Sequence, residues 1–378
     1  MIASMVQIDV LRGDNVVLRP FRREDAADVV VGCNDPLTRR YLPLLPDPYT
    51  EQDALWWINE GAPATFVNGG YAYGIADPAT DRIIGGVGIS RVHEGTGEIG
   101  YWVAPAGRRR GAATAATRTL AAHALAHGVQ RLVLKTEAEN TASQRVAIAA
   151  GFTRECVERG GGRGRDGSRH DLIVWARLAT DSGDPVPRIL PDLPNRSSTS
   201  RGELTDGVVC LRPLGPDDIP DVVEIRTLPD VVQTSVGLPD PDVIAKRCRE
   251  AEASWLAGER ADFTIRDAAT GAFAGEIGLY YWGFRTSEAM TGYSMLPAWR
   301  GRGYATRAVR LLARWAFSHV GIARLVAGTA PWNEASQRVL ARAGFQREGY
   351  ERSRLPGPDG TRVDNLVWSL LPTDPIPD

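Results

Sequence analysis

The chain has 378 residues, a formal net charge of −2 and 24% charged residues, values that suit a globular protein of two or three domains. The balanced charge argues against nucleic-acid binding, and no apolar run is long enough to span a membrane. The four cysteines form no Cys-x-x-Cys pair and no signal-peptide pattern opens the chain, so we expect a cytoplasmic protein without disulfides or metal sites.

The first half of the chain predicts alternating strands and helices. The helices begin with acidic residues and carry apolar residues at helical spacing, whereas the strands are short apolar runs. In chain order the predicted elements are a strand at 16–18, a helix at 24–31, a helix around 55–58, a hairpin over 75–85, a strand at 98–103, a long helix, a strand at 131–136, a helix from about 140 and a final strand around 175.

The second half predicts the same elements in the same order. They are a strand at 208–211, a helix at 217–225, a helix around 253–256, a hairpin over 263–279, a strand at 291–296, a long helix ending at 321, a strand at 324–329, another helix and a final strand around 368.

Single residues recur along with the elements. Tyr101 returns as Tyr293, and other matched residues return at nearly the same spacing from end to end. Such a register predicts two copies of one domain, each with its own core. We expect an N-terminal domain at 1–180, a proline- and serine-rich linker at 181–204 and a C-terminal domain at 205–378.

The most specific signal is the glycine-arginine loop Arg300–Ala305, which joins a predicted strand to a predicted helix. Its backbone N–H groups and the free donors of the first helical turn converge on one point, which suits a phosphate or pyrophosphate. Its glycines let a ligand approach the backbone, and its arginines add positive charge. The first copy has its counterpart at 108–113.

A second motif follows each loop. Asn140 and Ser143 in the first copy match Asn333 and Ser336 in the second, and a Gly-Phe pair comes after both. Together the two motifs resemble the GNAT N-acetyltransferase superfamily, and its RimJ/RimL-like branch in particular. The resemblance implies an α/β (α+β) fold with two tandem domains, each a mixed sheet of six to seven strands flanked by helices. It also implies that each sheet splays open between its fourth and fifth strands and holds acetyl-coenzyme A in the gap.

The resemblance further implies roles for individual residues. Ser143 and Ser336 would lie near the thioester sulfur as proton donors, and Glu98 would be a base or would orient a water molecule. The cofactor-binding positions that it implies are Val103, Arg108, Arg109, Arg110, Gly111, Ala112, Ala113 and Asn140 in the first copy, and Leu296, Arg300, Gly301, Arg302, Gly303, Tyr304, Ala305 and Asn333 in the second.

The sequence departs from the family's pattern at several positions. Ala147 and Leu340 stand where many relatives outside this branch have a tyrosine as general acid. The first copy has an arginine in place of Gly301, so we expect its loop to be less well shaped and the second domain to bind the cofactor more tightly. The second copy has Met290 at the position of Glu98.

Other motifs carry less weight. Gly162–Gly167 spells G-x-G-x-x-G but leads into a strand, so it lacks the context of a dinucleotide-binding loop. His123 and His127 have a spacing that can hold a metal, but no third ligand is evident and no metal is predicted. Trp56–Trp57 and Trp255 are expected in the core, the alternative being that they border an acceptor cleft.

The predicted function is an acetyl-CoA-dependent N-acetyltransferase that acts on a peptide N-terminus or a small-molecule amine. One alternative is that one domain binds coenzyme A without turnover. Another is a resistance or tailoring enzyme that acetylates an antibiotic or natural product. We expect a monomer, in which the two copies form an intramolecular pseudo-dimer, or a homodimer.

Overall fold

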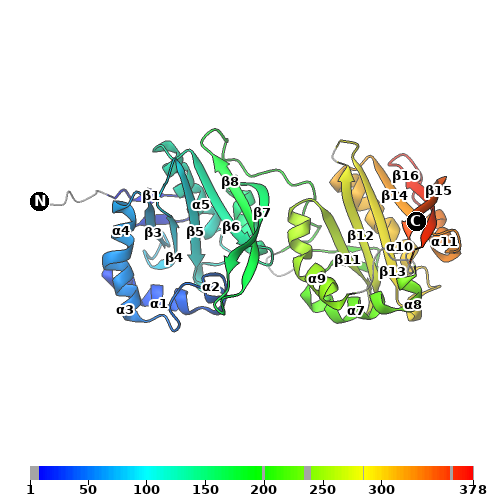
Figure 1. The fold of residues 1–378 in the computed structure, drawn as a ribbon, viewed down its shortest axis with the longest axis horizontal. Helices are drawn as coiled ribbons and strands as arrows, with labels where there is room; N and C mark the ends of the chain where they lie inside the picture. The colour runs from blue at the N-terminus through cyan, green and yellow to red at the C-terminus, as the bar shows by residue number, and fades with distance from the viewer. Residues whose placement is uncertain (1–7, 198–200, 234–239, 284, 358–360, 378) are drawn as a thin grey trace, which may run out of the picture. The chain divides into compact units, whose positions relative to one another are not determined.

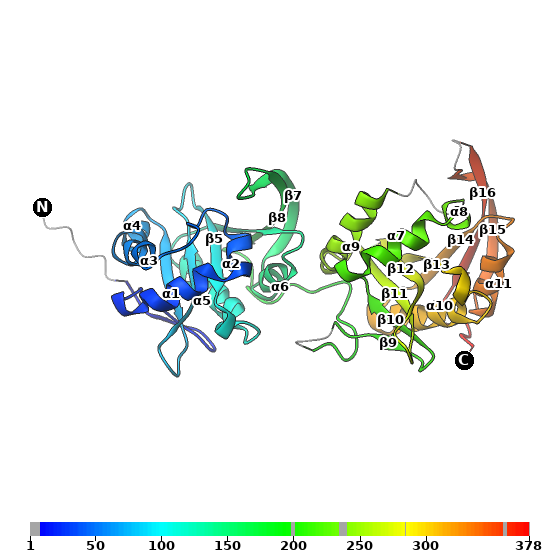
Figure 2. The ribbon, with the colours of Figure 1, turned by 90° about the horizontal axis from the view of Figure 1, so that it is seen from below.

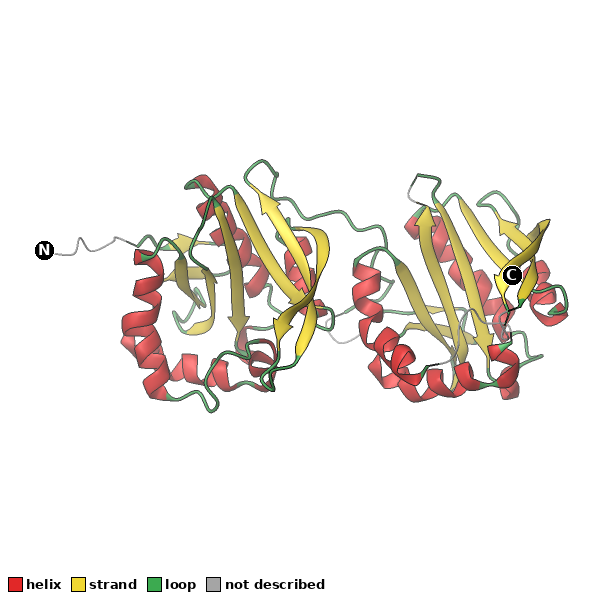
Figure 3. Ribbon diagram, viewed as in Figure 1, coloured by secondary structure: helices red, strands yellow, loops and turns green. Residues whose placement is uncertain are grey.

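The computed structural model describes residues 8–197, 201–233, 240–283, 285–357 and 361–377 (Figure 1). The chain divides into two compact units, Met1–Pro187 and Arg188–Asp378. In Figure 3 each unit has its own curved sheet bordered by helices.

The N-terminal unit is built on an eight-stranded sheet with the order β1-β2-β3-β4-β5-β6-β8-β7. Neighbouring strands are antiparallel except for β5 and β6, which run parallel. The strands are β1 (Leu11–Arg12), β2 (Val17–Arg19), β3 (Tyr71–Ala76), β4 (Ile83–Ile89), β5 (Thr96–Val103), β6 (Arg131–Glu137), β7 (Thr153–Arg163) and β8 (Arg169–Leu178).

Helices of the N-terminal unit cover both faces of this sheet. Trp102 of β5 packs against Gly32 of α1, whereas Tyr101 reaches Ser143 of α6. Neighbouring side chains in a strand point to opposite faces, so α1 and α6 lie on opposite sides. The helices are η1 (Arg23–Asp25), α1 (Ala26–Asn34), α2 (Pro36–Tyr41), α3 (Glu51–Trp56), η2 (Trp57–Gly61), α4 (Ala62–Val67), η3 (Pro105–Gly107), α5 (Ala112–Ala126) and α6 (Thr141–Ala149).

The C-terminal unit has the same topology, again with eight strands and one parallel pair, β13 with β14. Figure 2 shows its helices from below. The strands are β9 (Leu204–Thr205), β10 (Val209–Pro213), β11 (Arg260–Asp267), β12 (Phe273–Gly283), β13 (Glu288–Met295), β14 (Arg324–Thr329), β15 (Gln346–Pro356) and β16 (Arg362–Leu370). The helices are η4 (Pro216–Asp218), α7 (Ile219–Thr227), α8 (Pro229–Val232), α9 (Pro241–Leu256), η5 (Pro297–Trp299), α10 (Tyr304–Trp315), η6 (Ala316–Val320) and α11 (Glu334–Arg342).

The amphipathic pattern of the long second-copy helix accounts for its packing. Val309, Leu312 and Ala313 are fully buried in a core shared with the sheet. Gly321 ends the helical segment with a φ of +77°, a conformation that glycine adopts without steric cost.

The predicted fold of two tandem domains with mixed, splayed sheets is confirmed, although each sheet has eight strands rather than six or seven. The first predicted strand of each domain, β2 or β10, pairs with a two-residue edge strand, β1 or β9, that precedes it in the chain. Segments this short carry too little apolar periodicity to be recognised in the sequence.

Much of the segment expected as a linker packs onto the domains. The Val186 N–H donates to the Ile148 carbonyl of the N-terminal unit at 3.0 Å. Leu190 and Leu193 are buried in the core of the C-terminal unit, and the Trp255 indole donates to the Pro191 carbonyl at 3.0 Å. The apolar residues between the prolines explain why this segment is held, because they bury surface that a free linker would expose.

Candidate active site

In both domains the two parallel strands separate part-way along their length. The pairing of β5 with β6 runs from Thr96 to Glu98, but β5 continues to Val103 beside β4, and β6 continues to Glu137 beside β8. In the C-terminal domain the pairing of β13 with β14 likewise runs from Glu288 only to Met290. The strands therefore open into a gap at their carboxyl ends, where open α/β sheets bind ligands.

The glycine-arginine loop borders this gap, and its shape is the same in both domains. Gly111 and Gly303 immediately precede α5 and α10 with φ values of +75° and +81°. Gly301 has a φ of +72°, and Arg109 adopts the same left-handed conformation at +59°. The expected loss of shape in the first loop is therefore not observed. An arginine there costs about 1–2 kcal/mol of backbone strain but preserves the turn.

The first arginine of each loop is held within the protein. Arg108 donates through Nε to the Val103 carbonyl at 2.9 Å and is paired with Asp35. Arg300 donates through Nε to the Met295 carbonyl at 3.0 Å and lies 2.5 Å from an Asp230 carboxylate oxygen. Both arginines therefore fix the loop to the end of the preceding strand, instead of adding free charge for a phosphate as the sequence suggested.

In each domain a later residue of the loop bonds to an aspartate at the end of the third or eleventh strand, Asp77 or Asp267. Arg110 donates to Asp77 at 3.1 Å, and in the second domain the Tyr304 hydroxyl donates to Asp267. The Arg302 guanidinium lies 5.5 Å from the centre of the Trp299 ring. Arg109, Arg110 and Arg302 are exposed, so they are the loop arginines that a bound anion would meet.

The two strand-end positions implied by the resemblance differ by one residue. Val103 is the last residue of β5 and offers its carbonyl to Arg108, but the matching bond in the second domain comes from Met295. Leu296 follows the end of β13, and its N–H donates to the Ala274 carbonyl at 2.9 Å.

The Asn-x-x-Ser motif caps the helix on the other side of the gap. Asn140 Oδ1 accepts the Ser143 N–H at 3.1 Å, and Asn333 Oδ1 accepts the Ser336 N–H at the same distance. This is an N-cap, in which the side chain satisfies one free donor of the first helical turn. Since Oδ1 is used in the cap, the amide NH₂ group of each asparagine is the remaining donor of that side chain.

The glutamine that follows each serine also has a clear place. Gln144 is 1% exposed and donates through Nε2 to the Ala138 carbonyl at 2.8 Å. Gln337 makes the matching bond to the Pro331 carbonyl, also at 2.8 Å. Each glutamine ties the start of its helix to the end of the preceding strand, and so fixes the position of the neighbouring serine.

A tyrosine completes the site, and its role was missed in the sequence. The Tyr101 hydroxyl lies 2.7 Å from Ser143 Oγ, and the Tyr293 hydroxyl lies 2.8 Å from Ser336 Oγ. Both tyrosines lie in the part of the strand that has left its parallel neighbour, so each bond links the two sides of the gap. Burial raises the pKa of both phenols well above the ordinary value, which keeps them protonated. Their recurrence in both copies was the only available signal.

Glu98 lies on the opposite face of β5 from Tyr101, next to the point where the strands separate. Its side chain is 53% exposed, and its carboxylate is 3.6 Å from the Lys135 ammonium group. In the second domain a carboxylate appears on the neighbouring strand instead. Glu276 of β12 is 2% exposed and paired with Arg226 and Arg247.

The structure also places the other residues that the sequence singled out: the second glycine-rich motif, the tryptophans and the histidine pair. Gly162–Gly167 lies at the turn between β7 and β8 rather than before a helix. Trp255 is buried in the core, but Trp56 is 61% exposed. The rings of His123 and His127 are 4.1 Å apart, and among the described residues no group of three or more metal-binding side chains is found. No helix in the described ranges is long and apolar enough to cross a membrane.

Comparisons with known proteins agree with this geometry. A family model described as an acetyltransferase (GNAT) domain matches the chain twice, at residues 15–153 and 209–346. The two matches leave out the described segment between the domains and the last strands of each sheet.

Curated relatives match over shorter stretches. The probable N-acetyltransferase YjcK of Bacillus subtilis is 38% identical over 86 residues, which is 23% of this chain and 47% of that protein. The ribosomal protein uS5-alanine N-acetyltransferase of Escherichia coli is 34% identical over 86 residues, 23% of this chain and 44% of that protein. The chain spans about half the length of the curated relatives it matches.

Solved structures match one domain's worth of the chain. Mycobacterium smegmatis RimJ in complex with CoA-disulfide is 26% identical with a TM-score of 0.41, covering 45% of this chain and 86% of that one. The spermidine N-acetyltransferase of Vibrio cholerae in complex with CoA and spermine is 15% identical with a TM-score of 0.40, covering 44% of this chain and 96% of that one.

Proposed function

The chain belongs to the GNAT acetyltransferase family, and from that premise we propose that it is an acetyl-CoA-dependent N-acetyltransferase with a working site in each domain. The observation that carries the proposal is the repeated gap. In both domains a parallel strand pair opens between a glycine-arginine helix start and a Tyr–Ser hydrogen bond. Because neither domain has lost any of these parts, a non-catalytic first domain is not favoured.

Three features of the gap suit coenzyme A. The pyrophosphate would lie at the start of α5 or α10, where free backbone N–H groups and the helix dipole favour an anion. The pantetheine arm carries amides, and it would lie along the free edge of β5 or β13 as an added strand lies on a sheet edge. We assign the amide NH₂ groups of Asn140 and Asn333, whose Oδ1 atoms are used in the helix caps, as donors for the arm.

The reaction would be direct attack of a neutral amine on the thioester carbon. The C–S bond breaks as the C–N bond forms, the thiolate leaves, and the nitrogen loses a proton. We assign the protonation of the thiolate to Ser143 and Ser336, each of which can be resupplied by the tyrosine hydroxyl bonded to it. Holding amine and thioester together supplies much of the rate gain.

The acceptor must lose a proton before it can attack. At pH 7 this costs a lysine side chain roughly 4–5 kcal/mol but an α-amino group only about 1 kcal/mol, from their ordinary pKa values. In the first domain we assign that proton to Glu98, whose carboxylate is 53% exposed. In the second domain Met290 takes its position, and Glu276 is held by two arginines. We therefore propose a peptide N-terminus or a small-molecule amine of low pKa as the acceptor of the second domain.

The decisive experiment follows thiol release from acetyl-CoA with a panel of peptide N-termini, polyamines and small amines. Calorimetry of the full chain should find two coenzyme A molecules per chain, and mass spectrometry should find the acetyl group on an amine nitrogen. A protein that binds coenzyme A but transfers acetyl to none of these amines would contradict the proposal.

A further inference from the structure

The sheet face opposite the Tyr–Ser pair differs sharply between the two domains. Gly86 and Trp102 face each other across β4 and β5, and Glu276 and Ser294 face each other across β12 and β13. The two pairs occupy matched positions in their sheets, next to the strand that enters the gap. This face also carries Glu98, so it is the face from which an amine would approach.

In the N-terminal domain this face is aromatic. A Cβ on Gly32 would lie 2.0 Å from the Trp102 ring, and a Cβ on Gly86 would lie 2.7 Å from its indole nitrogen, so only glycines leave room for this side chain. Trp57 is accommodated in the same way, since a Cβ on Gly61 would lie 2.6 Å from its ring. Both indoles therefore occupy space that glycines leave open.

In the C-terminal domain the matched wall is ionic. Arg247 stands at the same distance from its helix N-cap, Asp240, as Trp57 does from Thr50. Its guanidinium lies 2.8 Å from Asp262 and 3.1 Å from Glu276, and both carboxylates are 2% exposed. An indole on one side is thus replaced by a guanidinium with two buried partners on the other.

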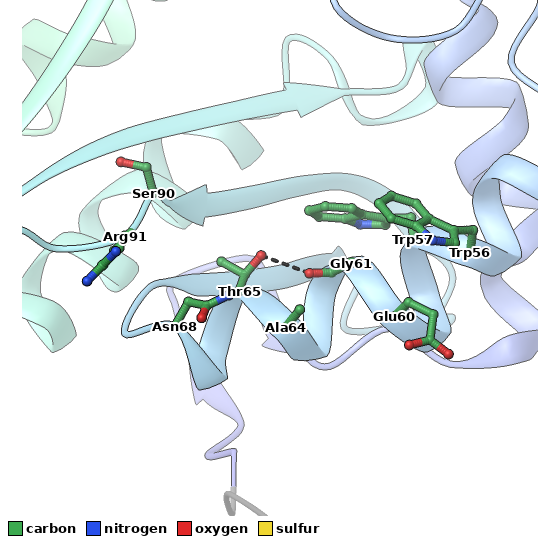
Figure 4. A pocket seen from close by; sticks show the side chains of 9 residues that line it. All are labelled: Trp56, Trp57, Glu60, Gly61, Ala64, Thr65, Asn68, Ser90 and Arg91. Carbon is green, nitrogen blue, oxygen red and sulfur yellow. Dashed lines mark hydrogen bonds between the residues drawn. The ribbon is translucent and has the colours of Figure 1, made fainter.

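A hollow lies beside the aromatic wall of the N-terminal domain (Figure 4). Its volume is about 680 Å³, and the Trp57 ring lies at one end of it, above the π-turn Trp57–Gly61. Ser90 also lines the hollow, and its hydroxyl accepts the Glu98 N–H at 3.1 Å, so the hollow and the candidate base both lie where β4 ends beside the start of β5. The lining residues are Trp56, Trp57, Glu60, Gly61, Ala64, Thr65, Asn68, Ser90 and Arg91.

We propose that the N-terminal domain takes an amine carried on a flat apolar body, which stacks on Trp57 in this hollow, and that the C-terminal domain does not. The inference rests on the proposed function and names the acceptor class of one of its two sites. Trp57 is partly exposed and lines the hollow, and its neighbour Trp56, which is 61% exposed, adds apolar surface that a flat ligand can cover. In the second domain the matched Arg247 is held by ion pairs to two buried carboxylates, so it offers no indole face for the same ligand to cover.

The test uses the full chain and 2-phenylethylamine, with ethanolamine as the polar comparison. Calorimetry in the presence of coenzyme A should find one molecule of 2-phenylethylamine per chain, bound at least tenfold more tightly than ethanolamine. Trp57→Arg, which installs the residue of the second domain, should weaken that binding about tenfold, and Trp57→Leu, which keeps apolar bulk without a flat ring, about threefold. Val67→Ala, on the same helical segment but outside the hollow, is the matched control.

The outcomes separate this inference from the proposed function. Equal binding of the two amines, two molecules of 2-phenylethylamine per chain, or binding unchanged by Trp57→Arg would overturn the inference, even if acetyl transfer to other amines is seen. Tight binding of 2-phenylethylamine that depends on Trp57, without thiol release from acetyl-CoA, would uphold the binding site and overturn the enzymatic function. Thermal unfolding of each variant shows whether a loss of binding reflects a loss of folding.

Discussion

On the side of the gap assigned to the cofactor, the two domains carry nearly the same chemical groups at matched positions. Both have a left-handed residue two positions before the left-handed glycine, an arginine bonded to the strand end, and a Tyr–Ser pair at 2.7 or 2.8 Å. On the acceptor side the same comparison finds Trp57 against Arg247 and Gly86 against Glu276. Under the proposed function, a shared cofactor accounts for the likeness of one side, and different acceptors account for the divergence of the other.

The largest expected effect would break the likeness at the Tyr–Ser pair. Removing both serine hydroxyls (Ser143→Ala with Ser336→Ala) should lower kcat by roughly 10²–10⁴-fold, the usual range for a lost general acid, with little change in coenzyme A affinity. Each single variant should keep the turnover of the other domain. Thiol-release kinetics and calorimetry measure the two quantities.

Ser318→Ala is the control, because this exposed hydroxyl bonds only to its own helix and to His319 among the described residues. Tyr101→Phe with Tyr293→Phe should approach the effect of the serine pair if the phenol resupplies the proton. A kcat unmoved in both double variants would remove the pair from the mechanism.

The ionic wall of the second domain gives the next effect, on stability. Asp262→Ala removes the buried carboxylate that Arg247 and Arg260 share and leaves Arg247 with Glu276 alone, and this should cost about 3–5 kcal/mol of unfolding free energy. The matched position in the first domain is Ala72, which carries no charge for an arginine to pair with. Ala72→Ser should therefore lower the free energy of unfolding much less. Calorimetric unfolding of the full chain should show one transition shifted by Asp262→Ala and the other unmoved.

The same carboxylate predicts an acid sensitivity of the C-terminal domain. Burial alone would raise the pKa of Asp262, but the guanidiniums of Arg247 and Arg260 outweigh it and hold that pKa below its ordinary value. A lowered pKa in the folded state stabilises the fold above the unfolded pKa of about 3.9, and this contribution is lost as the pH falls below that value. The transition that responds to Asp262→Ala should therefore move most as the pH falls below about 4. An equal loss in the variant would contradict this assignment.

The sequence alone predicted the repeat, the order of strands and helices and the glycine-arginine loop, because each is a pattern within the sequence. The mixed sheet followed from the family resemblance, and the Asn–Ser motif was recognised without its role as a helix cap. The sequence could not predict the pairing of Tyr101 with Ser143, which lie on different elements and meet only through the opening of β5 from β6. The ion pair between Arg108 and Asp35 could not be predicted from the sequence for the same reason. The aromatic and ionic walls also depend on register across strands, which a one-residue slip would reverse.

A third effect concerns the loop glycine that precedes α10. Gly303→Asp should weaken coenzyme A binding in the second domain by at least about 100-fold, because a carboxylate would face the pyrophosphate at a helix start that favours anions. Gly303→Ala is the matched control. It shares the strain of a side chain at φ +81° but adds no charge, and a Cβ there meets no atom within 4 Å. Calorimetry of the full chain should then find one tight coenzyme A site in Gly303→Asp and two in Gly303→Ala. An unchanged affinity in Gly303→Asp would contradict the assignment of the loop to the pyrophosphate.

The smallest effect sharpens the comparison between the loops themselves. Arg109→Gly and Gly301→Arg exchange the residue in which the loops differ, and both positions already have left-handed backbones, at +59° and +72°. Arg109→Gly relieves about 1–2 kcal/mol of strain but gives the unfolded chain more freedom, so the two changes in stability nearly cancel. Gly301→Arg has room, since a Cβ there meets no atom within 4 Å. Because the shape of the loop is preserved, the exchange alters only its charge. Coenzyme A affinity should therefore fall a few-fold in the first domain and rise a few-fold in the second. Both changes should shrink at high ionic strength. If the first domain instead gains affinity from the glycine at every salt concentration, backbone strain and not charge distinguishes the two loops.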